Sequence, residues 1–325
     1  GNTVAARAQN CYNRKKTEGT IVKQVQLGGV SVPAVAVGCM RMNGSDKEGR
    51  KRFIAAAMDG GMNFFDHADI YGGGACETLF GEAVKEMKIP RDKMFLQSKC
   101  GIVPGKMFDF SERHITESVE GSLRRLSTDH LDCLILHRPD TLAEPEEVAA
   151  AFDKLEKAGK VRMFGVSNMH PAQIELLKSA VRQPIVCDQL QFSPVHASMI
   201  SCGIEANMQT GGAVSRDGYV LEYCRLHGVT IQAWSPYQYG FFEGVYLRND
   251  KFSELNKVIG EIGEKYGIED AAVVAAWILR HPAGMQMVTG TMNEKRLAAI
   301  AAGASVVMTR EEWYRIYIAA GHILP

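Results

Sequence analysis

The chain has 325 residues, a length that one α/β barrel domain commonly reaches. Its 37 Lys and Arg residues balance its 37 Asp and Glu residues, and this zero net charge argues against nucleic acid or anionic lipid as a partner. No apolar run is long enough to span a membrane, so we expect no membrane segment. The eight cysteines include no C-x-x-C pair, so we expect a cytoplasmic protein without a metal site. A small molecule is the expected partner. These numbers leave the oligomeric state open.

The first predicted element is a β-hairpin. Residues 22–27 and 30–33 flank the pair Gly28-Gly29, and two glycines suit the positive φ angles of a tight turn. A hairpin at this point would close one end of a barrel.

Short apolar runs alternate with helical patterns along the rest of the chain. Eight runs have the character of barrel strands: 34–38, 62–65, 94–98, 131–136, 161–166, 185–187, 229–233 and 285–288. Helices are expected near 47–59, 76–87, 112–126, 145–157, 171–181, 217–227 and 269–280, with two more near 293–302 and 309–320. This alternation predicts an α/β fold, a (β/α)8 TIM barrel with an N-terminal β-hairpin and extra C-terminal helices. We expect residues 1–20 to form an N-terminal tail and residues 21–325 a single barrel domain.

An open, doubly wound sheet is the alternative fold. It is disfavoured because no G-x-G-x-x-G or G-x-x-x-x-G-K-[ST] fingerprint stands in a strand-to-helix turn. Gly72-Gly73-Gly74 precedes a helix, but its spacing does not match a phosphate cradle, and we interpret it as a flexible turn. Two long loops, 193–216 and 236–251, follow predicted strands and are expected to shape the substrate pocket.

Four polar side chains stand at the ends of three successive predicted strands. Asp66 and Tyr71 follow the second run, Lys99 the third and His137 the fourth. In a barrel of parallel strands these ends share one rim, where barrel enzymes carry their catalytic groups. The four residues are therefore expected to converge in an active site.

The chemistry that they suggest is proton donation to a carbonyl group. A free phenol has a pKa of about 10, and an adjacent ammonium such as Lys99 is expected to lower the pKa of Tyr71. Asp66 would keep Lys99 charged and fixed in direction, because an unpaired buried ammonium is costly. A neutral His137 would donate a hydrogen bond to the substrate oxygen as negative charge develops on it.

None of these residues is a source of hydride, so a cofactor is expected to supply it. The remaining strand ends offer amides that pair with a carboxamide, an indole that stacks on a flat ring, and hydroxyl and cationic groups for phosphate. The residues concerned are Ser167, Asn168, Gln189, Trp234, Ser235, Pro236, Gly290, Thr291, Lys295 and Arg296. Nicotinamide fits the first two demands.

Several motifs together resemble the aldo-keto reductase superfamily, over residues 21 to 325. They are N-F-F-D-H-A-D-I-Y, F-L-Q-S-K, L-D-C-L-I-L-H-R-P-D, G-V-S-N, D-Q-L-Q, A-W-S-P and a glycine-threonine turn followed by Arg296. The ending W-Y-R-I-Y-I-A-A-G is similar to a bacterial branch of predicted oxidoreductases within that superfamily.

The resemblance implies a (β/α)8 barrel that binds NADP(H) without a Rossmann domain and reduces aldehydes or ketones to alcohols. By position, the catalytic tetrad of the family falls on Asp66, Tyr71, Lys99 and His137, with Tyr71 as the general acid. Its carboxamide contacts fall on Ser167, Asn168 and Gln189, its stacking aromatic on Trp234, and its adenosine-phosphate region on Gly290, Thr291 and Arg296. Metal ligands are not implied.

The chain departs from the family pattern at three positions. Gly290 stands where many members have Lys, and Ile300 where they have Asn. Arg296 therefore carries the expected preference for NADPH over NADH. Asp188 replaces the usual Asn before Gln189.

The predicted substrate loop, 236–251, is rich in aromatic residues, and this suggests an apolar or aromatic carbonyl substrate. The aromatic residues are Tyr237, Tyr239, Phe241, Phe242 and Tyr246.

Three other functions stay open. The first is a non-catalytic, nicotinamide-binding regulatory protein on the same barrel, which the intact tetrad disfavours. The second is a Schiff-base aldolase with Lys99 as nucleophile, which a neighbouring Asp66 disfavours because it would keep the amine protonated. The third is a metal hydrolase that uses Asp66, His67, Asp69 and His137, for which no H-x-H or H-E-x-x-H spacing is present. We expect His67 instead to pack beside or under the site.

Overall fold

A closed barrel of eight parallel strands forms the centre of the molecule in this computed structural model, which describes residues 22–325. The expected tail at residues 1–20 lies outside the described residues. The strands are β3 (Val35–Gly38), β4 (Phe64–Asp66), β5 (Phe95–Cys100), β8 (Leu131–Leu136), β9 (Val161–Ser167), β10 (Ile185–Gln191), β11 (Thr230–Trp234) and β14 (Gln286–Thr289). Each barrel strand pairs with the next barrel strand along the chain, and β14 pairs with β3 to close the ring. The predicted barrel and its eight strands are confirmed.

The strand burial explains why the sequence reads as short apolar runs. A barrel strand is covered by side chains inside the barrel and by helices outside it, so it is apolar on both faces. All four residues of β3 and all six of β8 are buried. The short apolar runs of the sequence are therefore strands, and the polar residues near their carboxyl ends, such as Asp66 and Lys99, are buried as well.

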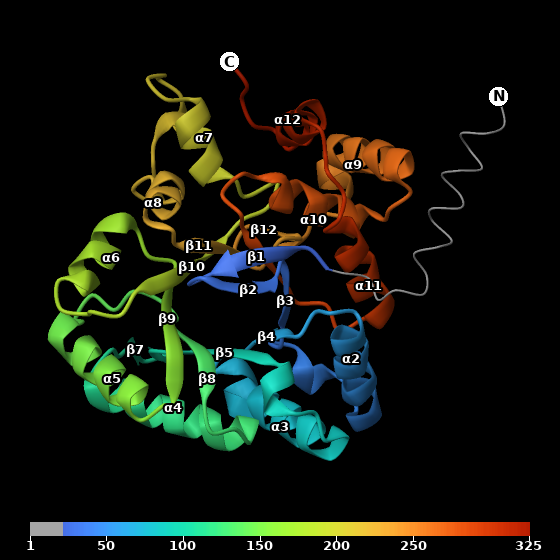
Figure 1. Cartoon of the computed structure of the whole chain (residues 1–325). Coiled ribbons are helices and arrows are strands. Elements are labelled where there is room, and N and C mark those ends of the chain that lie inside the picture. Colours follow the sequence, from blue (N-terminus) through green and yellow to red (C-terminus); the bar gives the residue numbers. More distant parts are fainter. Residues whose placement is uncertain (1–21) are drawn as a thin grey trace.

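The predicted hairpin is also confirmed. Strands β1 (Gln24–Leu27) and β2 (Val30–Pro33) are antiparallel, and the turn between them has φ angles of 56° at Gly28 and 83° at Gly29. The hairpin lies across one end of the barrel (Figure 1), and the Thr230 hydroxyl donates to the Gln26 carbonyl at 2.7 Å. The carboxyl ends of the strands lie at the opposite end of the barrel, which the hairpin does not cover.

Helices surround the barrel and cover its strands. They are α2 (Lys47–Asp59), α3 (Ala75–Met87), α4 (Glu112–Leu126), α5 (Pro145–Lys157), α6 (Pro171–Lys178), α7 (Ser198–Ile204), α8 (Val220–His227), α9 (Ser253–Tyr266), α10 (Asp270–Arg280), α11 (Glu294–Gly303) and α12 (Arg310–Ala319). Every predicted helix is present. Within the described residues, none of these helices combines the length and the apolarity that crossing a membrane requires.

Two helices were missing from the sequence prediction, α7 and α9. Helix α9 buries Leu255, Val258, Ile259 and Ile262, an apolar stripe at helical spacing that was present in the sequence. It packs against α12, where Lys265 pairs with Glu312. The stripe could have been recognised, whereas α7 is only seven residues long.

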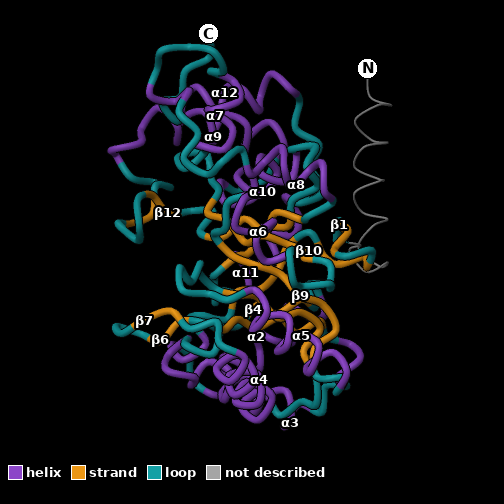
Figure 2. The backbone as a smooth tube through the Cα atoms, turned by 90° about the vertical axis from the view of Figure 1, so that its left-hand side faces the viewer, coloured by secondary structure: helices purple, strands orange, loops and turns teal. Residues whose placement is uncertain are grey.

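Two small hairpins extend from the end of the barrel opposite β1 and β2 (Figure 2). One consists of β6 (Ile102–Val103) and β7 (Met107–Phe108), and the other of β12 (Gln238–Tyr239) and β13 (Gly244–Val245). Neither was predicted, because strands of two residues give no periodic signal. They lie beyond the ends of the barrel strands.

Close packing of α3 on α4 depends on a glycine. A Cβ atom on Gly81 would lie 2.4 Å from the backbone oxygen of Arg125 and 2.7 Å from the carbonyl carbon of Leu126. We expect Gly81→Ala to lower the free energy of unfolding by about 1–3 kcal/mol through overpacking, although alanine is the better helix former. The matched control is Gly260→Ala in α9, where a Cβ meets nothing within 4 Å, and it should raise stability by up to about 1 kcal/mol. Urea denaturation measures both, and equal effects would contradict the packing argument.

Candidate active site

A pocket of about 1220 Å³ lies at the carboxyl ends of the barrel strands. Its lining includes nine predicted cofactor residues, Ser167, Asn168, Gln189, Trp234, Ser235, Pro236, Gly290, Thr291 and Arg296. Asp66, Tyr71 and His137 also line it, and Lys99 lies fully buried next to them. The structure therefore brings the predicted residues together at one rim, as parallel strands require.

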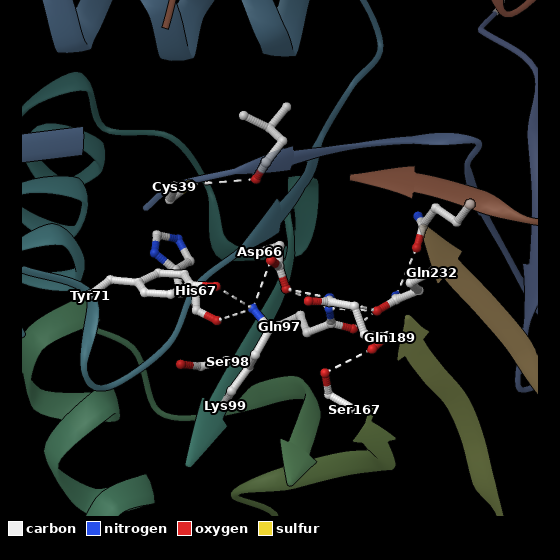
Figure 3. Close-up of polar contacts among 12 residues, drawn as sticks. Cys39, Asp66, His67, Tyr71, Gln97, Ser98, Lys99, Ser167, Gln189 and Gln232 are labelled. Atoms are coloured by element: carbon white, nitrogen blue, oxygen red, sulfur yellow. Dashed lines mark hydrogen bonds and ion pairs between the residues drawn. The ribbon is translucent and has the colours of Figure 1, made fainter. Parts of the chain in front are cut away.

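Lys99 is the centre of the polar contacts in this pocket (Figure 3). Its Nζ donates to Asp66 Oδ2 at 2.7 Å, to the His67 carbonyl at 2.8 Å and to the Tyr71 hydroxyl at 3.1 Å. An ammonium has three N–H donors, and all three are used. Burial lowers the pKa of Lys99, but the negative charge of Asp66 and the Tyr71 hydroxyl outweigh burial and raise it above its ordinary value. Lys99 is thus charged, and each of its N–H groups has an acceptor.

The other oxygen of Asp66 is held by a network of glutamines inside the barrel. Asp66 Oδ1 accepts from Gln97 Nε2 at 2.6 Å and from Gln189 Nε2 at 3.2 Å. Both glutamines donate to Gln232 Oε1 (Figure 3). Gln232 in turn donates to Gln286 Oε1. The network gives each buried amide a partner, so it fixes the direction of the carboxylate.

The pKa of Tyr71 differs from the sequence expectation. Burial is the largest influence and raises it, and the charge of Lys99 opposes burial without overcoming it, so the pKa lies above the ordinary value of a phenol. The expected net lowering is wrong for this structure. Tyr71 is consequently protonated at neutral pH.

The left-handed turn after Tyr71 explains the three glycines that follow it. Gly72, Gly73 and Gly74 have φ angles of 58°, 63° and 92°. Three successive left-handed residues are accessible at little cost only to glycine. The turn returns the chain from the rim into α3, in agreement with its interpretation as a turn.

Two histidines near Lys99 are held neutral. The His137 ring lines the pocket perpendicular to Tyr71, with ring centroids 5.9 Å apart. Burial, then the charges of Lys99 and Arg138, keep the pKa of His137 well below its ordinary value. His67 is fully buried against Phe80, outside the pocket lining, and burial lowers its pKa to about 3.

Ser167, Asn168 and Trp234 form a chain of hydrogen bonds on one wall. Trp234 Nε1 donates to Asn168 Oδ1 at 3.1 Å, and Asn168 Nδ2 donates to Ser167 Oγ at 2.8 Å. Asn168 has a φ of 57°, and Ser235 has a φ of 49°. Residues other than glycine rarely adopt this conformation, and such strain concentrates at functional sites.

The end of the pocket near Gly290 has two guanidinium groups, those of Arg41 and Arg296. Asn293 caps α11 by accepting from the Arg296 backbone N–H at 2.9 Å, so the helix begins at the pocket. Arg41, which the sequence analysis did not single out, reaches from the loop after β3 and donates to the Gly290 carbonyl at 3.0 Å. A Cβ on Gly290 would lie 2.6 Å from Arg41 Nη1, so Arg41 occupies space that a side chain at 290 would need. Lys295 is exposed and does not line the pocket.

Only part of the predicted loop contribution is present. Tyr237, Phe241 and Phe242 line the pocket, whereas the buried Tyr246 donates to the Pro236 carbonyl instead. Tyr239 packs against Phe252. No residue of the segment 193–216 belongs to the lining, so the expectation that this loop shapes the pocket is wrong. Ile102 and Arg138 do line it and were not predicted.

Asp188 is a buried acid directly behind this site. It is fully buried in β10 and faces the backbone N–H groups of Asn168 and Met169, but neither carboxylate oxygen makes a hydrogen bond of good geometry. Burial raises the pKa of Asp188 to about 8. A protonated Asp188 is neutral at pH 7 and resembles the asparagine expected at this position. In residues 22–325 there is no cluster of three His, Cys, Asp or Glu side chains arranged to hold a metal ion.

Comparisons with known proteins show which proteins this chain is similar to. A model described as "Aldo/keto reductase family" matches residues 34–320. The 6-dehydroglucose reductase of Agrobacterium fabrum is 35% identical over 277 residues, which are 82% of this chain and 86% of that protein. Oxidoreductase YdhF of Escherichia coli is 36% identical, with 84% and 88% covered. A crystal structure of an aldo/keto reductase from Klebsiella pneumoniae in complex with NADP and acetate has a TM-score of 0.71 and 25% identity, covering 91% and 94%.

The burial of Asp188 makes stability depend on pH. An unfolded aspartate ionises near pH 4, whereas folded Asp188 keeps its proton to about pH 8, so this residue reduces stability progressively as pH rises between these values. As pH rises from 4.5 to 8, the free energy of unfolding of Asp188→Asn should therefore increase by about 3–5 kcal/mol relative to that of the parent protein. Asp69, whose pKa burial raises to about 7, contributes to both proteins and cancels. Denaturation at the two pH values measures the difference, and a constant difference would contradict the argument.

Proposed function

Because this chain belongs to the aldo/keto reductase family of oxidoreductases, we propose that it reduces an aldehyde or ketone to an alcohol with NADPH, and that Tyr71 is the general acid. The observation that carries the proposal is the buried contact of Lys99 with Asp66 and the Tyr71 hydroxyl at the wall of a large pocket. Carbonyl reduction needs a proton donor beside the carbonyl oxygen, and Tyr71 is protonated at neutral pH.

The pocket has the groups that a nicotinamide dinucleotide requires. Ser167, Asn168 and Gln189 offer amide and hydroxyl groups for a carboxamide, and Trp234 offers an indole face, with Ser235 and Pro236 beside it. Gly290 and Thr291 precede the start of α11, where backbone N–H groups suit phosphate. Arg296 and Arg41 add two guanidinium groups at this end, which support NADPH over NADH. When bound, NADPH supplies the hydride.

Tyr71, Lys99 and His137 have different roles in the proposed proton transfer. Tyr71 gives its proton to the carbonyl oxygen as negative charge develops there. Lys99, held charged by Asp66, stabilises the phenolate that remains, because it already donates to the same oxygen. Neutral His137 lines the pocket with its ring perpendicular to that of Tyr71, and it is suited to donate a hydrogen bond to the carbonyl oxygen.

The two other barrel functions are less well supported. A Schiff-base aldolase needs an unprotonated amine, but all three N–H donors of Lys99 have acceptors and its pKa is raised. A non-catalytic, nicotinamide-binding regulatory protein would not need the Asp66, Lys99 and Tyr71 contacts, which are all present.

Replacing Tyr71 with Phe tests the proton donor. We expect kcat for aldehyde reduction to fall by about 10²- to 10⁴-fold, while the Kd for NADPH changes little, because the acid is removed and the binding groups stay. Tyr223→Phe is the matched control, since it removes the same hydroxyl from α8, outside the pocket lining. Turnover by Tyr71→Phe at the rate of this control would refute the assignment.

Replacing Arg296 with Ala tests the cofactor preference. We expect the Kd for NADPH to rise about 10- to 100-fold and the Kd for NADH to change far less, because a guanidinium contact with the 2′-phosphate is lost. Lys295→Ala is the control, because it removes a neighbouring cation that does not line the pocket. Titration of both cofactors against Trp fluorescence gives the constants. Equal losses for NADPH and NADH would show that Arg296 does not recognise the 2′-phosphate.

A further inference from the structure

Arg138 is a charged side chain in the pocket that the proposed chemistry does not use. It directly follows His137 at the end of β8, it is half-buried, and it lines the pocket. Around the barrel, β8 and β14 are separated by three strands in either direction, so they stand on opposite sides of the ring. The backbone of Arg138 therefore lies across the mouth from Gly290, directly after the residue that would contact the reacting carbonyl, and its guanidinium reaches toward Trp234 at the end of β11.

The guanidinium of Arg138 has aromatic neighbours but no acceptor among the described residues. Its Cζ lies 5.9 Å from the ring centroid of Trp234 and 5.9 Å from that of Phe241. No carboxylate of residues 22–325 forms an ion pair with it, and no hydrogen bond from its side chain is present. By contrast, Arg125 pairs with the buried Glu77, and Arg91 pairs with Asp132.

An unpaired guanidinium in a concave pocket needs a partner from outside the chain. Its five N–H donors lose water when the pocket fills, and removing a charge from water without a partner is costly. Burial already lowers the pKa of Arg138 somewhat. The planar fork of a guanidinium matches a carboxylate with two parallel hydrogen bonds, whereas neighbouring aromatic rings favour an apolar or aromatic body.

We propose that Arg138 determines substrate specificity by binding a carboxylate, and that the substrates are aldehydes or ketones with an aromatic or apolar body and a carboxylate at the end away from the carbonyl. This inference rests on the proposed function, because it takes the carbonyl to lie between Tyr71 and His137. Phe241 flanks the body of such a substrate, Trp234 stays the stacking partner of the nicotinamide, and Arg138 binds the anionic end of the substrate.

The test compares two aldehydes that differ in one group, 4-carboxybenzaldehyde and 4-methylbenzaldehyde. We expect Arg138→Gln to lower kcat/KM for 4-carboxybenzaldehyde by about 10- to 100-fold, and that for 4-methylbenzaldehyde by less than about threefold. Arg138→Lys should retain part of the preference, because it keeps the charge and loses the fork. Arg216→Gln is the control for net charge, since Arg216 lies in the segment 193–216 outside the pocket, and it should leave both values unchanged.

The outcomes separate this inference from the proposed function. Normal reduction of 4-methylbenzaldehyde by Arg138→Gln shows that the variant is folded. Equal losses for the two aldehydes, or no loss for either, would overturn the role of Arg138 while leaving carbonyl reduction intact. If the parent protein reduces neither aldehyde, the proposed function fails for this class. Binding of 4-(hydroxymethyl)benzoate to the NADPH-saturated protein then decides the inference: weaker binding by Arg138→Gln supports it, and equal binding overturns it.

Discussion

The ammonium of Lys99, with an acceptor for each of its three N–H groups, is the interaction on which the rest of the site depends. It joins the ends of β4 and β5 and holds the hydroxyl of Tyr71 at 3.1 Å. A buried ion pair is weak support for stability, because desolvation offsets much of its attraction. Its value here is geometric, since Asp66 is itself fixed by Gln97 and Gln189. The proton donor thus rests on the polar interior of the barrel.

Several residues near Lys99 have a strained backbone or a buried polar group without a hydrogen-bond partner, and both features lower stability. Asn168 and Ser235 have left-handed backbones at the pocket wall, and Asp188 is buried beside the same turn. His67 is buried with both ring nitrogens unpartnered. Left-handed backbone and unsatisfied groups also occur away from the pocket, for example at Lys88 and Gln183, but a buried acid and a buried histidine without hydrogen-bond partners beside one pocket agree with a site that favours chemistry over stability.

The charge of the pocket also differs from the charge of the whole chain. Equal numbers of acidic and basic residues describe the molecule as neutral. The pocket nevertheless has Arg41 and Arg296 at one end, and a third guanidinium, that of Arg138, over the Trp234 ring. A chain of zero net charge can therefore place several guanidinium groups in one pocket, beside the carboxylates of Glu269 and Asp270, and these guanidinium groups are suited to bind anionic groups of a ligand.

By itself the sequence determined the barrel, its terminal hairpin, and the strand ends on which Asp66, Tyr71, Lys99 and His137 stand. Apolar runs and turn residues are local signals, and parallel strands in a closed ring can place their ends only at one rim. Tertiary structure alone decided that the pKa of Tyr71 is raised, that the loop 193–216 stays away from the pocket, and that Arg41 and Arg138 enter it. These properties depend on burial and on neighbours remote in the chain, and no sequence pattern encodes either.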